Sequence, residues 1–257
     1  MKLIMQRLKM LLFNRSLYAG VIVILFWYLM HFLVGSYAIP SPHVTMVNFL
    51  QIFPGTLSFH LLVSLGRILT ALTISLVFGC LIGLWIGISQ RADAYITPIV
   101  YILYPLPKIA FLPILMVLFG LGNTPKIVLI VIIIIFQIII ATRDGVKEIP
   151  KEQFYSVMSL GLSKLEIYRH LVLPAVTPKI ITSLRISVGV SISILFLGEN
   201  FATTYGIGYF IMNSWLMVNY VEMFSGILAL SLLGLLLFKV IDLVENKLCR
   251  WIKIGKN

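Results

Sequence analysis

Charged residues are scarce in this chain of 257 residues, and acidic ones are the scarcest. Nine Asp and Glu and 20 Lys and Arg together make up 11% of the sequence, against about 25% in an ordinary soluble domain. Hydrophobic residues make up 60%, against roughly 45–50%. A soluble fold of this length cannot cover so much apolar surface with so few polar groups. The shortage of charge excludes a soluble enzyme and a disordered chain, and it predicts a membrane protein that crosses the bilayer several times.

Cysteine and the usual patterns of catalytic residues are also sparse. The two cysteines, Cys80 and Cys249, lie far apart and form neither a disulfide scaffold nor a metal-ligand spacing. The four histidines are scattered, so no metal site is predicted. A glycine-rich phosphate loop followed by lysine is missing too, so we expect this chain to bind no ATP, Mg²⁺ or other cofactor. These absences argue against an enzyme.

The net charge of +11 raises the question of nucleic-acid binding, but the distribution of charge argues against it. Residues 16–66 contain no Lys, Arg, Asp or Glu, and the basic residues gather in short clusters between long apolar runs. That pattern is typical of loops on the cytoplasmic side of a membrane, whereas a nucleic-acid groove interleaves basic and aromatic residues. We expect membrane lipid, and no nucleic acid, as the surroundings of this chain.

Six apolar runs are candidates for membrane-spanning helices, each of which needs about 20 apolar residues. They are Leu17–Val34, Phe59–Ser89, Tyr95–Gly120, Ile127–Thr142, Ile180–Gly198 and Met223–Val244. The third run contains prolines, which remove backbone donors and break helices. The sequence therefore predicts an all-α membrane protein with six transmembrane helices in one permease-like domain over residues 1–257.

The basic residues also predict the orientation of these helices. If both termini are cytoplasmic, sixteen of the 20 Lys and Arg lie on the inner side, and the outer loops 35–58 and 200–221 contain none. We therefore expect cytoplasmic termini. The first run exceeds the usual apolar core of a signal peptide and no Ala-x-Ala cleavage site follows it, so we expect it to remain as a membrane anchor.

The one long polar stretch, residues 143–178, reads as two short helices facing the cytoplasm. Pro150 suits the first turn of the first helix, and Gly161 can end that helix in the left-handed conformation. Ser163-Lys164-Leu165-Glu166 is a capping box that opens the second helix, and Pro174 is expected to stop it. The stretch is either an amphipathic loop on the membrane surface or a docking element for a soluble partner.

This loop resembles the EAA loop of ABC-importer permeases. In that family Glu-Ala-Ala is followed by three residues, a glycine, nine residues and Ile-x-Leu-Pro. Here Gly161 precedes Leu171-Val172-Leu173-Pro174 at that spacing, and Tyr155-Ser156-Val157 stands where Glu-Ala-Ala is usual. Further segments resemble the branch that handles nitrate, sulfonates, taurine and bicarbonate: Pro40-Ser41-Pro42, residues 105–113, residues 118–122, Gly198-Glu199 and residues 206–209.

The resemblance implies a multi-pass inner-membrane permease with the type I importer fold. It implies a dimer of permeases, two ABC ATPase subunits that bind ATP and Mg²⁺, and an extracytoplasmic solute-binding protein. The dimer is expected to be a homodimer, and pairing with a second, different permease chain is the alternative. The pair would form the translocation pathway for a small anion such as a sulfonate, taurine, nitrate or bicarbonate. Contact with the ATPase would run through residues 150–174. The implied coupling residues are Tyr155, Ser156, Val157, Gly161, Leu162, Ser163, Leu171, Leu173 and Pro174.

Charges within apolar runs are expensive and are candidates for function. Lys108 follows Pro105 and Pro107 in the third run, where irregular backbone is tolerated if it lines a watery cavity, so these residues are candidates for the pathway or its gate. A buried ion pair, or an amine that extends to the interface, is the alternative for Lys108. Glu199 reads either as a carboxylate at the outer interface or as a contact to Lys108 or to the solute-binding protein.

The three remaining charges in or beside apolar runs read as structural. Arg67 is expected above the outer interface, and Lys126 is expected to extend its amine outward to water. Arg185 lies six residues after Lys179, about 9 Å along a helix, and is expected to anchor the inner interface.

Three alternatives to an importer of small anions stay open. The same machinery could import a vitamin precursor. A stand-alone secondary transporter would need ion-binding residues at the midplane and often inverted repeats, and neither is visible. A membrane-embedded enzyme would need clustered His or carboxylates within the spans.

Overall fold

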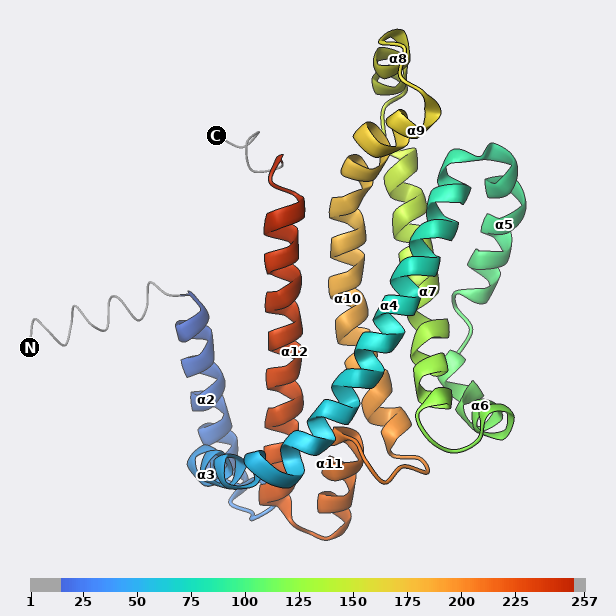
Figure 1. The fold of residues 1–257 in the computed structure, drawn as a ribbon. Helices are drawn as coiled ribbons and strands as arrows, with labels where there is room; N and C mark the ends of the chain where they lie inside the picture. The colour runs from blue at the N-terminus through green and yellow to red at the C-terminus, as the bar shows by residue number, and fades with distance from the viewer. Residues whose placement is uncertain (1–14, 252–257) are drawn as a thin grey trace, which may run out of the picture. The chain divides into compact units, whose positions relative to one another are not determined.

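The computed structural model describes residues 15–251, and within this range every regular element is a helix. The chain (Figure 1) divides into two units, Met1–Ser58 with Phe210–Ala229 and Phe59–Tyr209 with Leu230–Asn257. Among the described residues, four helical stretches are long and apolar enough to cross a membrane, and a bent pair makes a fifth. A shorter apolar helix covers Tyr18–Val34, in the first expected span.

The second unit is built around two helices that run in the same direction, α4 (Ser58–Ile88) and α7 (Thr124–Lys147). Three glycines at intervals of four residues on α4 allow the contact. A Cβ at Gly79 would lie 2.9 Å from Ile138, one at Gly83 2.6 Å from Thr142, and one at Gly87 2.7 Å from Val146. The partners on α7 are also spaced by four and ascend in the same order, so the two helices are parallel.

Between α4 and α7 the chain returns through a broken helix. α5 (Gln90–Leu103) and the segment Lys108–Phe119, which contains the 3₁₀ turn η2 (Lys108–Phe111) and α6 (Leu112–Phe119), meet at an angle of 79°. Pro105 and Pro107 lie in the gap, where neither can supply a backbone donor. The predicted interruption of the third apolar run by prolines is confirmed.

Two further helices complete this unit, and each is antiparallel to the one before it. α10 (Leu173–Glu199) contacts α7 at opposite ends: Gly145 faces Val176, and Gly198 faces Lys126. α12 (Tyr220–Leu248) packs on α10 where Gly234 meets Ile192. The buried core between these helices is mostly Ile, Leu and Val from α4, α7, α10 and α12.

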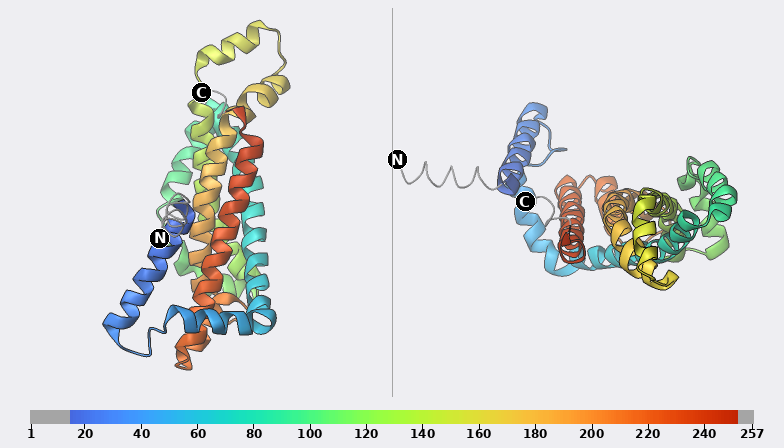
Figure 2. Two further views of the ribbon diagram at one scale, coloured as in Figure 1. Left: turned by 90° about the vertical axis from the view of Figure 1, so that its left-hand side faces the viewer. Right: turned by 90° about the horizontal axis from the view of Figure 1, so that it is seen from above.

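The polar stretch forms α8 (Lys151–Ser159), α9 (Lys164–Ile167) and the π-helical turn η3 (Tyr168–Val172), with α8 and α9 extending beyond the end of the neighbouring helices (Figures 1 and 2). Gly161 has φ of +76°, and Ser163 and Glu166 form the predicted capping box. The expectation that Pro174 stops the second helix is wrong. Pro174 is the second residue of α10, and the chain continues from the π-helical turn η3 into α10 without a break.

The first unit contains α2 (Arg15–Val34), α3 (Pro42–Ile52), the π-helical turn η1 (Phe53–Leu57) and the beginning of α12. The Trp27 indole N–H donates to the Pro40 carbonyl over 3.0 Å, and the indole ring stacks on the ring of Phe224. Ser225 donates to the Asn48 side chain over 2.9 Å. The short helices α3 and α11 (Ile207–Leu216) lie in segments expected to be loops.

Candidate functional site

Lys108 lies at the joint of the broken helix, buried in a part of the chain where the backbone is irregular. Its amine donates to the Tyr104 carbonyl over 2.7 Å and lies 4.9 Å from the centre of the Phe136 ring, within cation–π range. No carboxylate of the described residues pairs with it. An ammonium group has three donors, so this buried cation is incompletely satisfied.

A cavity of about 330 Å³ lies beside this amine. It is lined by Tyr104, Leu106, Lys108, Ile109, Ile133, Gln137 and Val190. A second cavity of about 580 Å³ shares Tyr104 and Gln137 with the first and continues to Asp144, Glu148 and Lys179. These three residues lie at the end of the unit that carries α8 and α9. Hollow space therefore follows α7 and α10 from the proline joint to that end.

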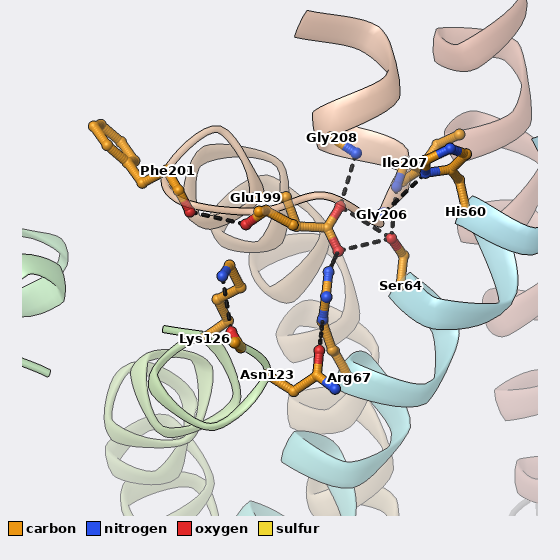
Figure 3. Close-up of polar contacts among 12 residues, drawn as sticks. His60, Ser64, Arg67, Asn123, Lys126, Glu199, Phe201, Gly206, Ile207 and Gly208 are labelled. Carbon is orange, nitrogen blue, oxygen red and sulfur yellow. Dashed lines mark hydrogen bonds and ion pairs between the residues drawn. The ribbon is translucent and has the colours of Figure 1, made fainter. Parts of the chain in front are cut away.

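Glu199 occupies the opposite end of the same helices, at the last residue of α10 (Figure 3). Its side chain is fully buried, at 0% exposure, and forms an ion pair with Arg67 of α4. Ser64 donates to the same carboxylate over 2.8 Å. The expectation of an interfacial carboxylate is wrong, and the partner of Glu199 is Arg67 rather than Lys108. Glu199 lines neither of the two cavities.

The Glu199 carboxylate also caps the first turn of α11. The N–H of Gly208 donates to it over 2.7 Å, the N–H of Ile207 donates to Ser64 Oγ over 2.8 Å, and the N–H of Gly206 donates to His60 Nδ1 over 3.0 Å. Three consecutive backbone donors at a helix start are thus satisfied by side chains from α4 and α10 (Figure 3). A carboxylate there is also favoured by the helix dipole.

The close packing against Glu199 explains why glycines occupy positions 206 and 208. Gly206 has φ of +144°, and a Cβ on it would lie 2.5 Å from both carboxylate oxygens of Glu199. A Cβ on Gly208 would lie 2.9 Å from the Glu199 Cβ. The backbone must approach the carboxylate closely, and only glycine permits that approach.

Two further polar side chains from the start of α7 reach the same cluster. Arg67 Nε donates to Asn123 Oδ1 over 2.9 Å, and the Lys126 amine donates to the Gly122 carbonyl over 2.8 Å. Lys126 is 1% exposed and Arg67 is 5% exposed. The expectation that Lys126 extends outward to water is therefore wrong, because its side chain is enclosed by the ends of α4, α7 and α10. The expected position of Arg67 above the outer interface stays a prediction.

The end that carries α8 and α9 holds a second set of ion pairs. Arg143 of α7 donates to Asp93 of α5 over 2.6 Å, and Lys147 pairs with the other oxygen of that carboxylate. Arg185 of α10 pairs with Asp242 and Glu245 of α12, each at 2.6 Å. Arg185 therefore joins α10 to α12, and its expected position at the inner interface stays a prediction. Sequence reasoning missed the pairs because they join residues 50 to 60 positions apart.

The predicted coupling segment presents apolar side chains to its surroundings. Leu160 and Leu165, on either side of the Gly161 turn, are 77% and 78% exposed, and Tyr155 and Met158 are exposed as well. Leu171 is half-buried and packs with the end of α7 and the start of α10. The remaining predicted coupling residues fall on this same helix-turn-helix: Ser156 and Val157 on α8, Leu162 and Ser163 in the turn, Leu173 and Pro174 at the start of α10.

Comparisons with known proteins find relatives and a solved structure that match most of this chain. A family described as "Binding-protein-dependent transport system inner membrane component" matches residues 75–253. The taurine transport system permease protein TauC of Escherichia coli (strain K12) is 29% identical over 225 residues, covering 85% of this chain and 82% of TauC. The formylaminopyrimidine transport permease protein ThiX of Halalkalibacterium halodurans is 29% identical, covering 84% and 87%. A chain of the MetNI methionine ABC transporter in an inward-facing conformation matches with a TM-score of 0.64 at 18% identity, covering 75% of this chain and 96% of that one, which shows a shared fold.

Proposed function

This chain belongs to the family of binding-protein-dependent transport system inner membrane components, and from that premise we propose that it forms the translocation pathway of an ABC importer for a small anion. It is an ABC transporter permease, and membership implies partner ATPases and a solute-binding protein. The observation that carries the finer proposal is the buried, carboxylate-free amine of Lys108 beside a cavity at the proline joint.

The charge of Lys108 favours an anion as the solute. A buried cation without a counter-ion is expensive, and a passing anion would supply the missing charge and accept the free ammonium protons. Pro105 and Pro107 keep the joint irregular, so that its backbone can line a cavity instead of continuing a helix. Together these residues form the proposed gate. A sulfonate, taurine, nitrate or bicarbonate fits this chemistry, and a vitamin precursor is the alternative, which the similarity to ThiX favours.

Glu199 takes an indirect part in this proposal. It holds the start of α11 and the 200–206 loop through Gly208, Ser64 and Arg67. In the proposed orientation, with both termini and α8–α9 on the cytoplasmic side, this loop faces the solute-binding protein. Glu199 then determines the shape of the surface on which that protein docks.

Two copies of the chain are proposed to enclose the pathway, because one bundle supplies half of it. The broken helix beside the Lys108 cavity and the loop after it present apolar side chains outward: Ile102, Val117 and Leu121 are all exposed. A second copy packed along α5 and α6 would cover them and close the cavity.

Coupling to the ATPase is proposed to run through residues 150–174. Leu160 and Leu165 are exposed beside the turn and would enter an apolar cleft on the ATPase. The turn itself depends on Gly161 and on the Ser163–Glu166 capping box. Movement of the ATPases would then reach the pathway directly, because η3 continues into α10 without interruption.

Two measurements test the proposal. First, the ATPase produced with this chain should remain bound to it in detergent. Leu165→Glu should abolish that binding, whereas Thr204→Glu, at another exposed site at the other end of the unit, should not. Second, Lys108→Met should abolish uptake by the assembled transporter while leaving ATPase binding intact, and Lys108→Arg should keep part of it. Normal uptake by Lys108→Met would rule out a role for this charge in the pathway.

A further inference from the structure

Gln137 is a polar residue that has no part in the proposed gate or in the proposed contact with the ATPase. It lies in the middle of α7 and is the only polar side chain among residues 127–141, which are otherwise Ile, Val, Leu, Phe and Ala. An amide within a membrane-spanning helix is costly unless it finds a hydrogen-bond partner. Its place in this helix therefore needs a reason.

The described residues supply no partner for the Gln137 side chain. Its backbone carbonyl accepts a hydrogen bond from Ser183 over 3.4 Å, but no hydrogen bond of the side-chain amide is found in this part of the chain. The residue is half-buried. Since the amide is not paired with protein, it is available to whatever fills the space beside it.

That space is the junction between the two cavities. Gln137 and Tyr104 line both the cavity beside Lys108 and the cavity that continues to Asp144 and Lys179. Any solute that moves from the proline joint toward the α8–α9 end must therefore pass this side chain. Two other residues of α7 lie close by, Ile133 in the first cavity and Ile140 in the second, and neither side chain can form hydrogen bonds.

We propose that Gln137 is a solute-binding residue of the pathway, at which the side-chain amide donates hydrogen bonds to the oxygens of an anion that leaves Lys108. The inference rests on the proposed transport function and specifies its solute as an oxyanion. A neutral amide suits a relay position, because it offers two donors without the strong attraction of a second cation. Binding along a pathway must be favourable enough for entry and weak enough for release.

The inference is tested by the reactivity of single cysteines in the full-length chain, with Cys80 and Cys249 replaced by serine. The probes are an anionic and a cationic methanethiosulfonate of similar size, used on the purified protein. Gln137→Cys should react readily, and the anionic reagent should react about tenfold faster relative to its rate on a free thiol, because a charged cleft concentrates counter-ions. Lys108→Met should remove that preference.

Controls on the same helices make the result interpretable. Ile134→Cys, fully buried three residues before Gln137 on α7, should stay unreactive, and Thr182→Cys, exposed in the second cavity, should react with both reagents. If Gln137→Cys does not fold, Ala141→Cys, one turn further along the same cavity, replaces it. Reactivity as low as that of Ile134→Cys would overturn the inference, and so would equal rates with both reagents whether or not Lys108 is present.

The role in transport needs one more comparison. In the assembled importer, Gln137→Glu should lose uptake by charge repulsion, while Gln137→Asn, which keeps the amide, should keep part of it. Unchanged uptake by Gln137→Glu would overturn the inference. Cysteine reactivity requires neither ATP nor a solute-binding protein, so a failure of this inference is distinguishable from a failure of the transport function, which is judged by ATPase binding.

Discussion

Arg67 and Glu199 form a buried ion pair although 132 positions separate them in the sequence. The pair joins the first half of α4 to the last residue of α10, and Ser64 and the N–H of Gly208 complete the coordination of the carboxylate. Both charges are enclosed by helix ends rather than by water. Each of the two charges is therefore stabilised mainly by the other, and either one would be costly to bury alone.

Removing one member of this pair should be more damaging than removing both. Arg67→Met leaves a buried carboxylate without its guanidinium, which we expect to lower the free energy of unfolding by about 3–5 kcal/mol. Arg67→Met combined with Glu199→Gln should lose less, because no unpaired charge remains. Equilibrium unfolding in mixed detergent micelles measures both. A double variant less stable than Arg67→Met would contradict the assignment of the pair.

The close approach of the backbone to Glu199 makes Gly206 intolerant of any side chain. Gly206→Ala would place a Cβ against the carboxylate at a φ of +144°, so we expect lower yield and a lower midpoint of thermal denaturation. Gly189→Ala is the matched control, since its Cβ would meet no heavy atom within 4 Å in the helix α10. It should be neutral or slightly stabilising, because alanine favours a helix over glycine by about 1 kcal/mol. Equal behaviour of the two variants would contradict the geometry of the cluster.

At Gly161 the expected defect lies in coupling rather than in folding. A Cβ there would meet no heavy atom within 4 Å, so the cost comes from the backbone alone, about 1–2 kcal/mol for a residue at φ of +76°. Gly161→Val should enter the membrane at near-normal levels, bind its ATPase weakly and lose stimulation of ATP hydrolysis by solute. Gly161→Ala should be intermediate.

The contrary result at Gly161 is equally clear. If Gly161→Val binds the ATPase with unchanged affinity and supports normal uptake, residues 150–174 are not the contact between permease and motor.

The proposed orientation predicts labelling from opposite faces of the membrane. Leu160 and Thr204 are exposed at opposite ends of the second unit, and neither side chain forms a helix cap. In a background without Cys80 and Cys249, an impermeant thiol reagent added to intact cells should label Thr204→Cys and spare Leu160→Cys until the cells are opened. Labelling of Leu160→Cys from outside intact cells would contradict the proposed orientation.

Elements with a strong local signal were predictable from the sequence. α4 was expected at Phe59–Ser89 and is observed at Ser58–Ile88, because a long apolar run in a membrane has few alternatives to a helix. The proline break and the capping box at Ser163 also depend on neighbours in sequence alone. These features follow from local chemistry.

The site residues were harder to place because their partners are distant in sequence. Nothing within a few positions of Glu199 indicates Arg67, so a buried carboxylate and an interfacial one look alike until α4 and α10 are packed. The helix α11 was missed for the same reason, since its first turn is capped from α4 and α10. Gln137 did carry a signal, as a single polar residue among apolar ones, but its meaning depends on cavities that only the fold creates.

The three glycines on α4 have a mechanical consequence for the transport cycle. A shift of α4 by one residue along α7, with the rotation about its own axis that such a shift requires, would bring Cys80, Leu84 and Ile88 to the places of Gly79, Gly83 and Gly87, where even one added carbon lies within 3 Å of α7. The register of α4 against α7 is therefore fixed, and the two helices must move together as one rigid body. The relative motion that alternating access requires must be taken up elsewhere, and the proline joint at residues 104–107 is where the backbone is interrupted.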